Sequence, residues 1–129
     1  MRIRPLIAVL CWLLPTAASA IEVESADITK NVEAWYVEDD TLPVVHIILS
    51  FEGAGYASDP ENRRGLSQLA ANLLLEGAGT YDALNYQKAL EGRAISIDAS
   101  VSADRLSVSI HSLKEHAPLA VELAKLALT

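Results

Sequence analysis

The chain has 129 residues, a net charge of −7 at neutral pH and a single cysteine. A chain of this length buries one modest core, which predicts one domain or part of one. The acidic balance argues against nucleic-acid binding and against adhesion to an anionic membrane, since both favour a basic surface.

The first twenty residues have the three parts of a secretory signal peptide, in order. Arg2 and Arg4 form a positive start, residues 6–14 form an unbroken apolar run, and Ala18-Ser19-Ala20 supplies a small-x-small cleavage site. The apolar run is less than half of the roughly 20 residues that cross a bilayer, which argues against a membrane anchor. Cleavage removes the only cysteine and takes the net charge to −9, so residues 21–129 are expected to be exported, to a bacterial periplasm, without disulfides.

The first elements after the leader are two strands and a helix. Residues 34–37 predict a short strand before an acidic turn, and residues 44–51 predict a nearly all-apolar strand buried on both faces. Residues 59–62 have the turn chemistry of a helix start. Between Gly65 and Glu76, apolar residues recur at the three- and four-residue spacing of an amphipathic helix. The residues of this stripe are Leu66, Leu69, Ala70, Leu73 and Leu74.

The second half of the chain predicts a helix, a hairpin and a last helix. Asp82 suits the N-cap of a helix through Leu90. Residues 95–110 alternate apolar and polar side chains around a turn, which is typical of a β-hairpin with one buried and one solvated face. Pro118 is best tolerated in a first helical turn, so the last helix is expected to begin near His116 or Ala117. The fold class is therefore α+β, with helices packed on a largely antiparallel sheet.

The three histidines form no recognisable metal motif. His46 lies within the apolar strand, where we expect a hydrogen-bonded structural residue, and His111 falls on the polar side of the hairpin. His111 and His116 are five residues apart, whereas metal-binding pairs on one helix face are four apart. A metal site made of all three is not expected. The sequence also lacks a Gly-x-Ser-x-Gly turn and a glycine loop for phosphate.

The segment from Gly65 to Gly77 resembles the zinc-helix segment of the insulinase/pitrilysin peptidases. In that family a Gly-Leu opening leads into an inverted zinc motif, His-x-x-Glu-His, and then into bulky apolar residues and a glycine. The flanking segments are similar as well, namely residues 34–44 with the opening strands and residues 51–60 with the approach to the helix. The hairpin of residues 95–110 and the helix after it are similar to the family elements that come after the zinc helix. The resemblance covers residues 31–129 and implies that residues 21–129 are the N-terminal, incomplete part of a pitrilysin-like domain.

The resemblance also implies that the catalytic motif has been lost. Carried over position by position, the first zinc histidine falls on Gln68, the general-base glutamate on Ala71 and the second histidine on Asn72. Neutral amides are poor zinc ligands, and an alanine has no group that accepts a proton from a bound water. The family's third ligand would lie beyond Thr129. We therefore expect no catalytic residue, no metal ligand and no enzymatic activity in this chain.

Members of this family without ligands are often the non-catalytic partner of an active subunit. The resemblance implies an exported, non-catalytic subunit of a zinc-peptidase heterodimer, which helps a His-x-x-Glu-His partner to bind peptides. Zinc is then expected only in that partner. The resemblance assigns no substrate-binding residue here, because those of family partners lie in a later domain. The alternatives are a stand-alone peptide-binding or assembly module that kept the fold, and an active enzyme with an unusual metal site.

Overall fold

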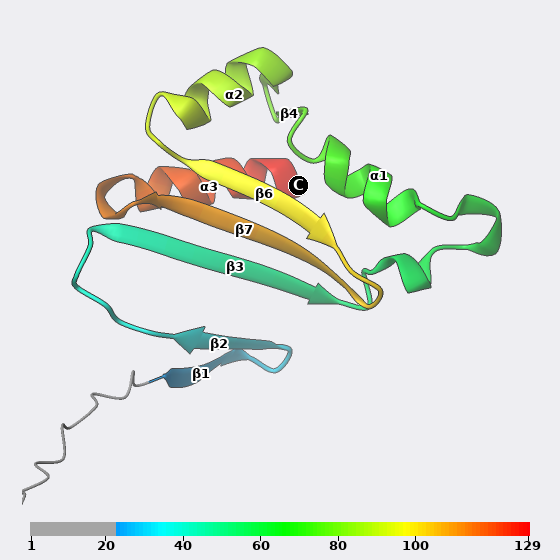
Figure 1. Ribbon diagram of the computed structural model, residues 1–129, viewed down its shortest axis with the longest axis horizontal. Coiled ribbons are helices and arrows are strands. Elements are labelled where there is room, and N and C mark those ends of the chain that lie inside the picture. The colour runs from blue at the N-terminus through cyan, green and yellow to red at the C-terminus, as the bar shows by residue number, and fades with distance from the viewer. Residues whose placement is uncertain (1–22) are drawn as a thin grey trace, which may run out of the picture. The chain divides into compact units, whose positions relative to one another are not determined.

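The computed structural model describes residues 23–129, so the predicted signal peptide of residues 1–20 lies outside the described part (Figure 1). The chain divides between Asp39 and Asp40 into two units, of which the structure describes residues 23–39 of the first and all of the second, Asp40–Thr129. In the first unit, strands β1 (Glu24–Thr29) and β2 (Val32–Tyr36) form an antiparallel hairpin in which Ala26 lies opposite Ala34. The short strand predicted at residues 34–37 is thus the second half of this hairpin, whereas the sequence pattern does not predict β1.

The second unit is built on a three-stranded antiparallel sheet with the order β3-β7-β6. Its strands are β3 (Val44–Glu52), β6 (Ser96–Val101) and β7 (Arg105–Leu113). Ile47, Ile110 and Ile97 lie side by side across the three strands and fix the register of the apolar face. The predicted hairpin of residues 95–110 is confirmed as β6 and β7.

The unit that contains the sheet also has three α-helices, and local residues explain where they begin. The helices are α1 (Leu66–Leu73), α2 (Ala83–Glu91) and α3 (Ala117–Leu128). Asp82 caps α2, since its Oδ1 accepts a hydrogen bond from the Asn85 N–H at 2.8 Å. Pro118 lies in the first turn of α3, as predicted. The short elements are η1 (Tyr56–Ser58), η2 (Glu61–Arg63), β4 (Gly77–Ala78), β5 (Tyr81–Asp82) and η3 (Lys114–His116).

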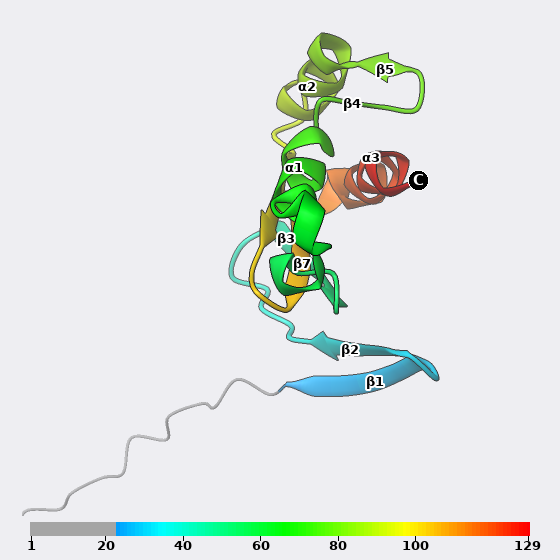
Figure 2. The same ribbon diagram turned by 90° about the vertical axis from the view of Figure 1, so that its right-hand side faces the viewer.

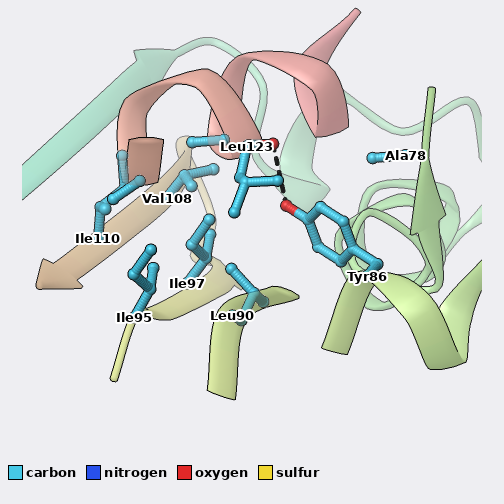
Figure 3. Packing of buried hydrophobic residues seen from close by; sticks show 10 residues of the cluster. Ala78, Tyr86, Leu90, Ile95, Ile97, Val108, Ile110 and Leu123 are labelled. Atoms are coloured by element: carbon cyan, nitrogen blue, oxygen red, sulfur yellow. Dashed lines mark hydrogen bonds between the residues drawn. The ribbon is translucent and has the colours of Figure 1, made fainter. Parts of the chain in front are cut away.

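One face of the sheet carries the core. Figure 2 shows α3 on one side of β3 and β7, and α3 contacts β7 directly. Figure 3 shows the buried side chains from the sheet, α2 and α3 pointing toward one another. The Tyr86 hydroxyl, fully buried, donates a hydrogen bond to the Leu123 carbonyl oxygen at 3.0 Å. This bond gives the phenol a partner inside an otherwise apolar cluster. The α+β class with helices on an antiparallel sheet is therefore confirmed. Within residues 23–129 no helix is both long enough and apolar enough to span a membrane.

The prediction that the strand of residues 44–51 is buried on both faces is wrong. β3 is an edge strand, and its residues alternate between exposed and half-buried. Val44, His46, Ile48 and Ser50 lie on the exposed face, and the Ile48 side chain is 61% exposed. The apolar run misled the sequence interpretation because helices of the Asp40–Thr129 unit cover only the other face.

The apolar stripe predicted for the first helix was expected to face the core, but most of it faces solvent in the structure. Leu66, Leu69 and Leu73 are exposed, and Leu69 keeps 54% of its surface accessible. The buried residue of α1 is Ala71, at 3% exposed, and α1 contacts β6. A methyl group at this position allows α1 to approach the sheet closely, so α1 turns a small residue inward and its leucines outward. The helix is also shorter than the predicted span from Gly65 to Glu76.

Candidate functional site

The segment between β3 and α1 is attached to the turn that joins β6 to β7. The Gly53 N–H donates to the Asp104 carbonyl at 2.7 Å, the Tyr56 N–H donates to the Ser102 carbonyl at 3.0 Å, and the Ala57 N–H donates to the Ala103 carbonyl at 2.9 Å. Gly55 lies so close to this turn that a Cβ atom there would overlap the Ala103 carbonyl oxygen. Only glycine therefore fits at position 55.

Asp59 fixes the start of α1 from outside the helix. Its carboxylate accepts the Gly65 N–H at 2.8 Å, the Ser67 N–H at 3.0 Å and the Ser67 hydroxyl. These donors stabilise the ionised carboxylate, so the pKa of Asp59 is lowered, first by the Ser67 hydroxyl and then by the backbone N–H groups. Gly65 precedes the helix with a φ of +90°, in the left-handed region that glycine adopts without strain. Asp59 and Gly65 therefore set the place at which α1 leaves the loop.

The three positions that correspond to the zinc motif lie on this helix. Gln68 and Asn72 are exposed and one helical turn apart, and the Gln68 Nε2 donates a hydrogen bond to the Asn72 Oδ1 at 3.1 Å. Ala71 lies between them in sequence and faces the protein interior. The structure thus brings the side chains at positions 68 and 72 together, as a metal-binding pair requires.

The chemistry of this site is that of two neutral amides. One amide donates to the other, which leaves an outward-facing carbonyl and amino group for hydrogen bonding with a polar ligand or water. Ala71 is buried, and its methyl group offers no proton acceptor. In the part of the chain that the structure describes, no group of three or more His, Cys, Asp or Glu side chains is arranged to hold a metal ion.

The histidines lie elsewhere, and their placement corrects the sequence interpretation. His46, expected as a structural residue of a strand with no open face, is exposed on β3. It lies directly opposite His111 of β7, and the two imidazole rings stack with their centres 3.8 Å apart. His116 precedes α3, with its Nε2 3.9 Å from the Glu115 Oε1.

A comparison with known protein families identifies the family to which this chain belongs. Residues 35–127 match the model of the insulinase peptidases, peptidase family M16. The chain belongs to the insulinase family. The matched residues run from β2 to α3, so they include the zinc-helix segment on which the family resemblance is based.

Two known proteins show how similar this chain is to its relatives. The chain is 32% identical over 120 residues to a protein of Helicobacter pylori named non-peptidase homolog YmxG, and the match covers 93% of this chain and 27% of that protein. It also matches the crystal structure of a peptidase M16 inactive domain from Pseudomonas fluorescens, with a TM-score of 0.75, 21% identity, and coverage of 83% of this chain and 26% of that one. The chain therefore spans about a quarter of the length of both relatives, and the second confirms the fold.

Sequence reasoning identifies the three motif positions but misses the residues that hold their helix in place. The sequence places Asp59 in a local helix start, whereas the structure shows that it acts on Ser67, eight residues further along the chain. Gly55 gives no sequence signal of its close approach to Ala103, because that contact joins segments almost fifty residues apart.

Proposed function

We propose that this protein is an exported, non-catalytic subunit of a two-subunit zinc peptidase of the insulinase family, and that it helps an active partner to hold a peptide. The observation that carries the proposal is the amide pair on α1. Gln68 and Asn72 keep the one-turn spacing of a zinc pair, but they hydrogen-bond to each other. Imidazole or carboxylate ligands are absent from these two positions, and so is a general base at Ala71.

The relatives support the non-catalytic part of the proposal. The Helicobacter pylori protein is a non-peptidase homologue by name, and it is aligned with 93% of this chain. Function depends on the site and not on the fold, so loss of the zinc motif removes the chemistry without removing the fold that would present a binding surface. The outward-facing amide groups of Gln68 and Asn72 are suited to hydrogen bonding with the backbone of a peptide.

The partner in this proposal is a subunit with an intact His-x-x-Glu-His motif. The full-length protein, carrying an affinity tag and expressed from its native promoter, is purified from cells and its co-purifying proteins are identified by mass spectrometry. We expect a motif-bearing insulinase-family protein in the complex, and we expect the peptidase activity of that partner to fall when this protein is deleted. The stand-alone binding module would instead bind peptides with no peptidase in the complex and would leave that activity unchanged.

A matched pair of variants separates substrate contact from structural use of the amides. The variant Gln68→Ala removes one exposed amide, whereas Gln87→Ala removes an exposed amide on α2. If the α1 amides contact peptide, Gln68→Ala raises the KM of the complex while Gln87→Ala does not. Equal KM values for both variants would mean that the α1 amides serve only the helix.

Export is the second part of the proposal and has its own test. Arg2, Arg4, the apolar run and Ala18-Ser19-Ala20 support cleavage after Ala20. N-terminal sequencing of the protein from a periplasmic extract is expected to begin at Ile21. Recovery of the uncleaved chain from the cytoplasmic fraction would overturn this part.

A further inference from the structure

The free edge of β3 lacks the features that keep most edge strands unpaired. In the described part of the chain the sheet order is β3-β7-β6, so β3 has a neighbouring strand on one side only. Its pairing with β7 runs from Val44 to Glu52 without a register shift, and residues 44–51 contain no proline and no Asp, Glu, Lys or Arg. By contrast β6, at the other edge, is shorter, carries Asp98 and contacts α1. A long, regular and apolar edge strand is a site at which a second chain pairs.

Hydrogen bonds at the two ends of β3 show which of its backbone groups point outward. The Lys114 N–H donates to the Pro43 carbonyl oxygen at 2.9 Å, and the Gly53 N–H donates to the Asp104 carbonyl oxygen at 2.7 Å. Backbone groups alternate sides along an antiparallel strand, so the odd-numbered residues of β3 bond to β7. The residues that direct their N–H and C=O groups toward the free edge are therefore Val44, His46, Ile48, Ser50 and Glu52. A second strand finds donors and acceptors along the whole of this edge.

We propose that this edge is the contact surface of a homodimer, in which β3 pairs antiparallel with β3 of a second copy. The two-fold axis passes through the middle of the strand, so Ile48 lies opposite Ile48 of the second copy. His46 then lies opposite Ser50, and Val44 lies opposite Glu52. This register uses every outward-facing residue and allows up to about ten backbone hydrogen bonds between the copies. The two three-stranded sheets join into one continuous sheet.

The side chains of β3 match a second copy better than they match an arbitrary strand. On the core face, Ile47 lies opposite Leu49 of the second copy, and both residues already pack against the core. Val45 lies opposite Phe51 on the same face, so the apolar layer continues across the axis. On the open face, the pairing covers Ile48, which is 61% exposed in the single chain. An unrelated peptide would share the backbone bonds but not this match.

Charge favours the same contact and the same register. Two copies of a chain with a net charge of −7 repel each other, so a surface without acidic residues is the one that they can share. Glu52 is the one charged residue of β3, and antiparallel pairing puts its two copies at opposite ends of the contact. They are then roughly 27 Å apart, which is beyond the Debye length of about 8 Å at physiological salt.

The homodimer does not rest on the proposed subunit role. The amide pair of Gln68 and Asn72 lies on α1, which contacts β6 at the opposite edge of the sheet from β3. Pairing through β3 therefore leaves the amide pair accessible, and either proposal can fail while the other holds.

Crosslinking with a short bifunctional thiol reagent tests the register. The full chain is used with Cys11→Ser, which removes its only native thiol. Ile48→Cys in this background is expected to crosslink to a dimer, because the two Cα atoms lie about 5.5 Å apart across the axis. Ser50→Cys is the matched control, since its two copies lie about 14 Å apart and are not expected to crosslink. A mixture of Ser50→Cys with His46→Cys is expected to crosslink, although neither variant does so alone.

Sedimentation velocity of the full chain over a dilution series tests the dimer itself, and the wild type is expected to dimerise reversibly. Ile48→Lys puts like charges directly opposite each other and is expected to weaken dimerisation by at least about tenfold. Leu69→Lys makes the same kind of change at an exposed leucine of α1 and is expected to leave dimerisation unchanged. Both variants are expected to keep the far-UV circular dichroism of the wild type.

Two results would overturn the proposal. One is a wild type that sediments as a single chain at every concentration, which would leave the edge of β3 to a strand of another protein. The other is a dimer that Ile48→Lys does not weaken, or that crosslinks through Ser50→Cys alone, because such a dimer uses another surface or another register.

Discussion

Replacing Leu123 with alanine tests whether α3 holds the sheet as the structure indicates. Leu123 is 2% exposed and belongs to the buried cluster in which the side chains of α2, α3 and the sheet meet (Figure 3). Leucine-to-alanine changes at such positions cost about 3 kcal/mol or more, from lost burial and the cavity left behind. For a unit of this size, a loss of about 3 kcal/mol lowers the Tm by roughly 12–20 °C.

Leu69→Ala is the matched control, because it makes the same chemical change on a helix where the leucine is 54% exposed. Its cost is expected to stay below about 1 kcal/mol, since little apolar surface returns to water and alanine favours the helix. Urea denaturation monitored by far-UV circular dichroism measures both free energies. If Leu69→Ala proves as costly as Leu123→Ala, the apolar stripe of α1 is packed after all and the inward orientation of Ala71 is wrong.

Three further predictions concern the core hydroxyl, the loop and the helix start. Tyr86→Phe is expected to cost about 1 kcal/mol in urea denaturation, because it removes one buried hydrogen bond. Burial also raises the Tyr86 pKa above 10.0, so the wild type should lose stability as the pH rises from about 10 and the phenylalanine variant should lose less. Gly55→Ala should lower the Tm, because the new Cβ would overlap the Ala103 carbonyl oxygen; an unchanged Tm would show that the loop is not attached to the turn. Because the pKa of Asp59 is lowered below 3.8 by hydrogen bonds from Ser67 and its neighbours, its contribution is present above that pH and lost as the pH falls further. Asp59→Asn should flatten the acid limb of the stability profile below about pH 4, and an unchanged limb would contradict this role.

The sequence predicts those elements whose signals are local. The Asp82 cap, the Pro118 start and the alternation of residues 95–110 all appear in the structure as expected. Each of these depends on the chemistry of a few neighbouring residues, which a sequence shows directly.

The features that the sequence does not predict depend on partners distant along the chain. An apolar strand such as residues 44–51 suits a central position, and only the strand order shows that β3 lies at an edge. His46 and His111 are 65 positions apart, so their stacking appears only with the register of β3 and β7. The α1 site is a mixed case, since the spacing of Gln68 and Asn72 predicts a shared face, whereas the hydrogen bond between them needs the structure.

The most direct test of the subunit role is reconstitution from separately purified proteins. The full-length protein and its motif-bearing partner are assayed for hydrolysis of a quenched fluorescent peptide, alone and mixed, with the zinc content of each measured. The proposed role predicts no hydrolysis and no zinc at α1 for this protein alone, weak hydrolysis by the partner alone, and a marked increase on mixing. Hydrolysis by this protein alone that is lost with Gln68→Ala, or partner activity that mixing leaves unchanged, would contradict it.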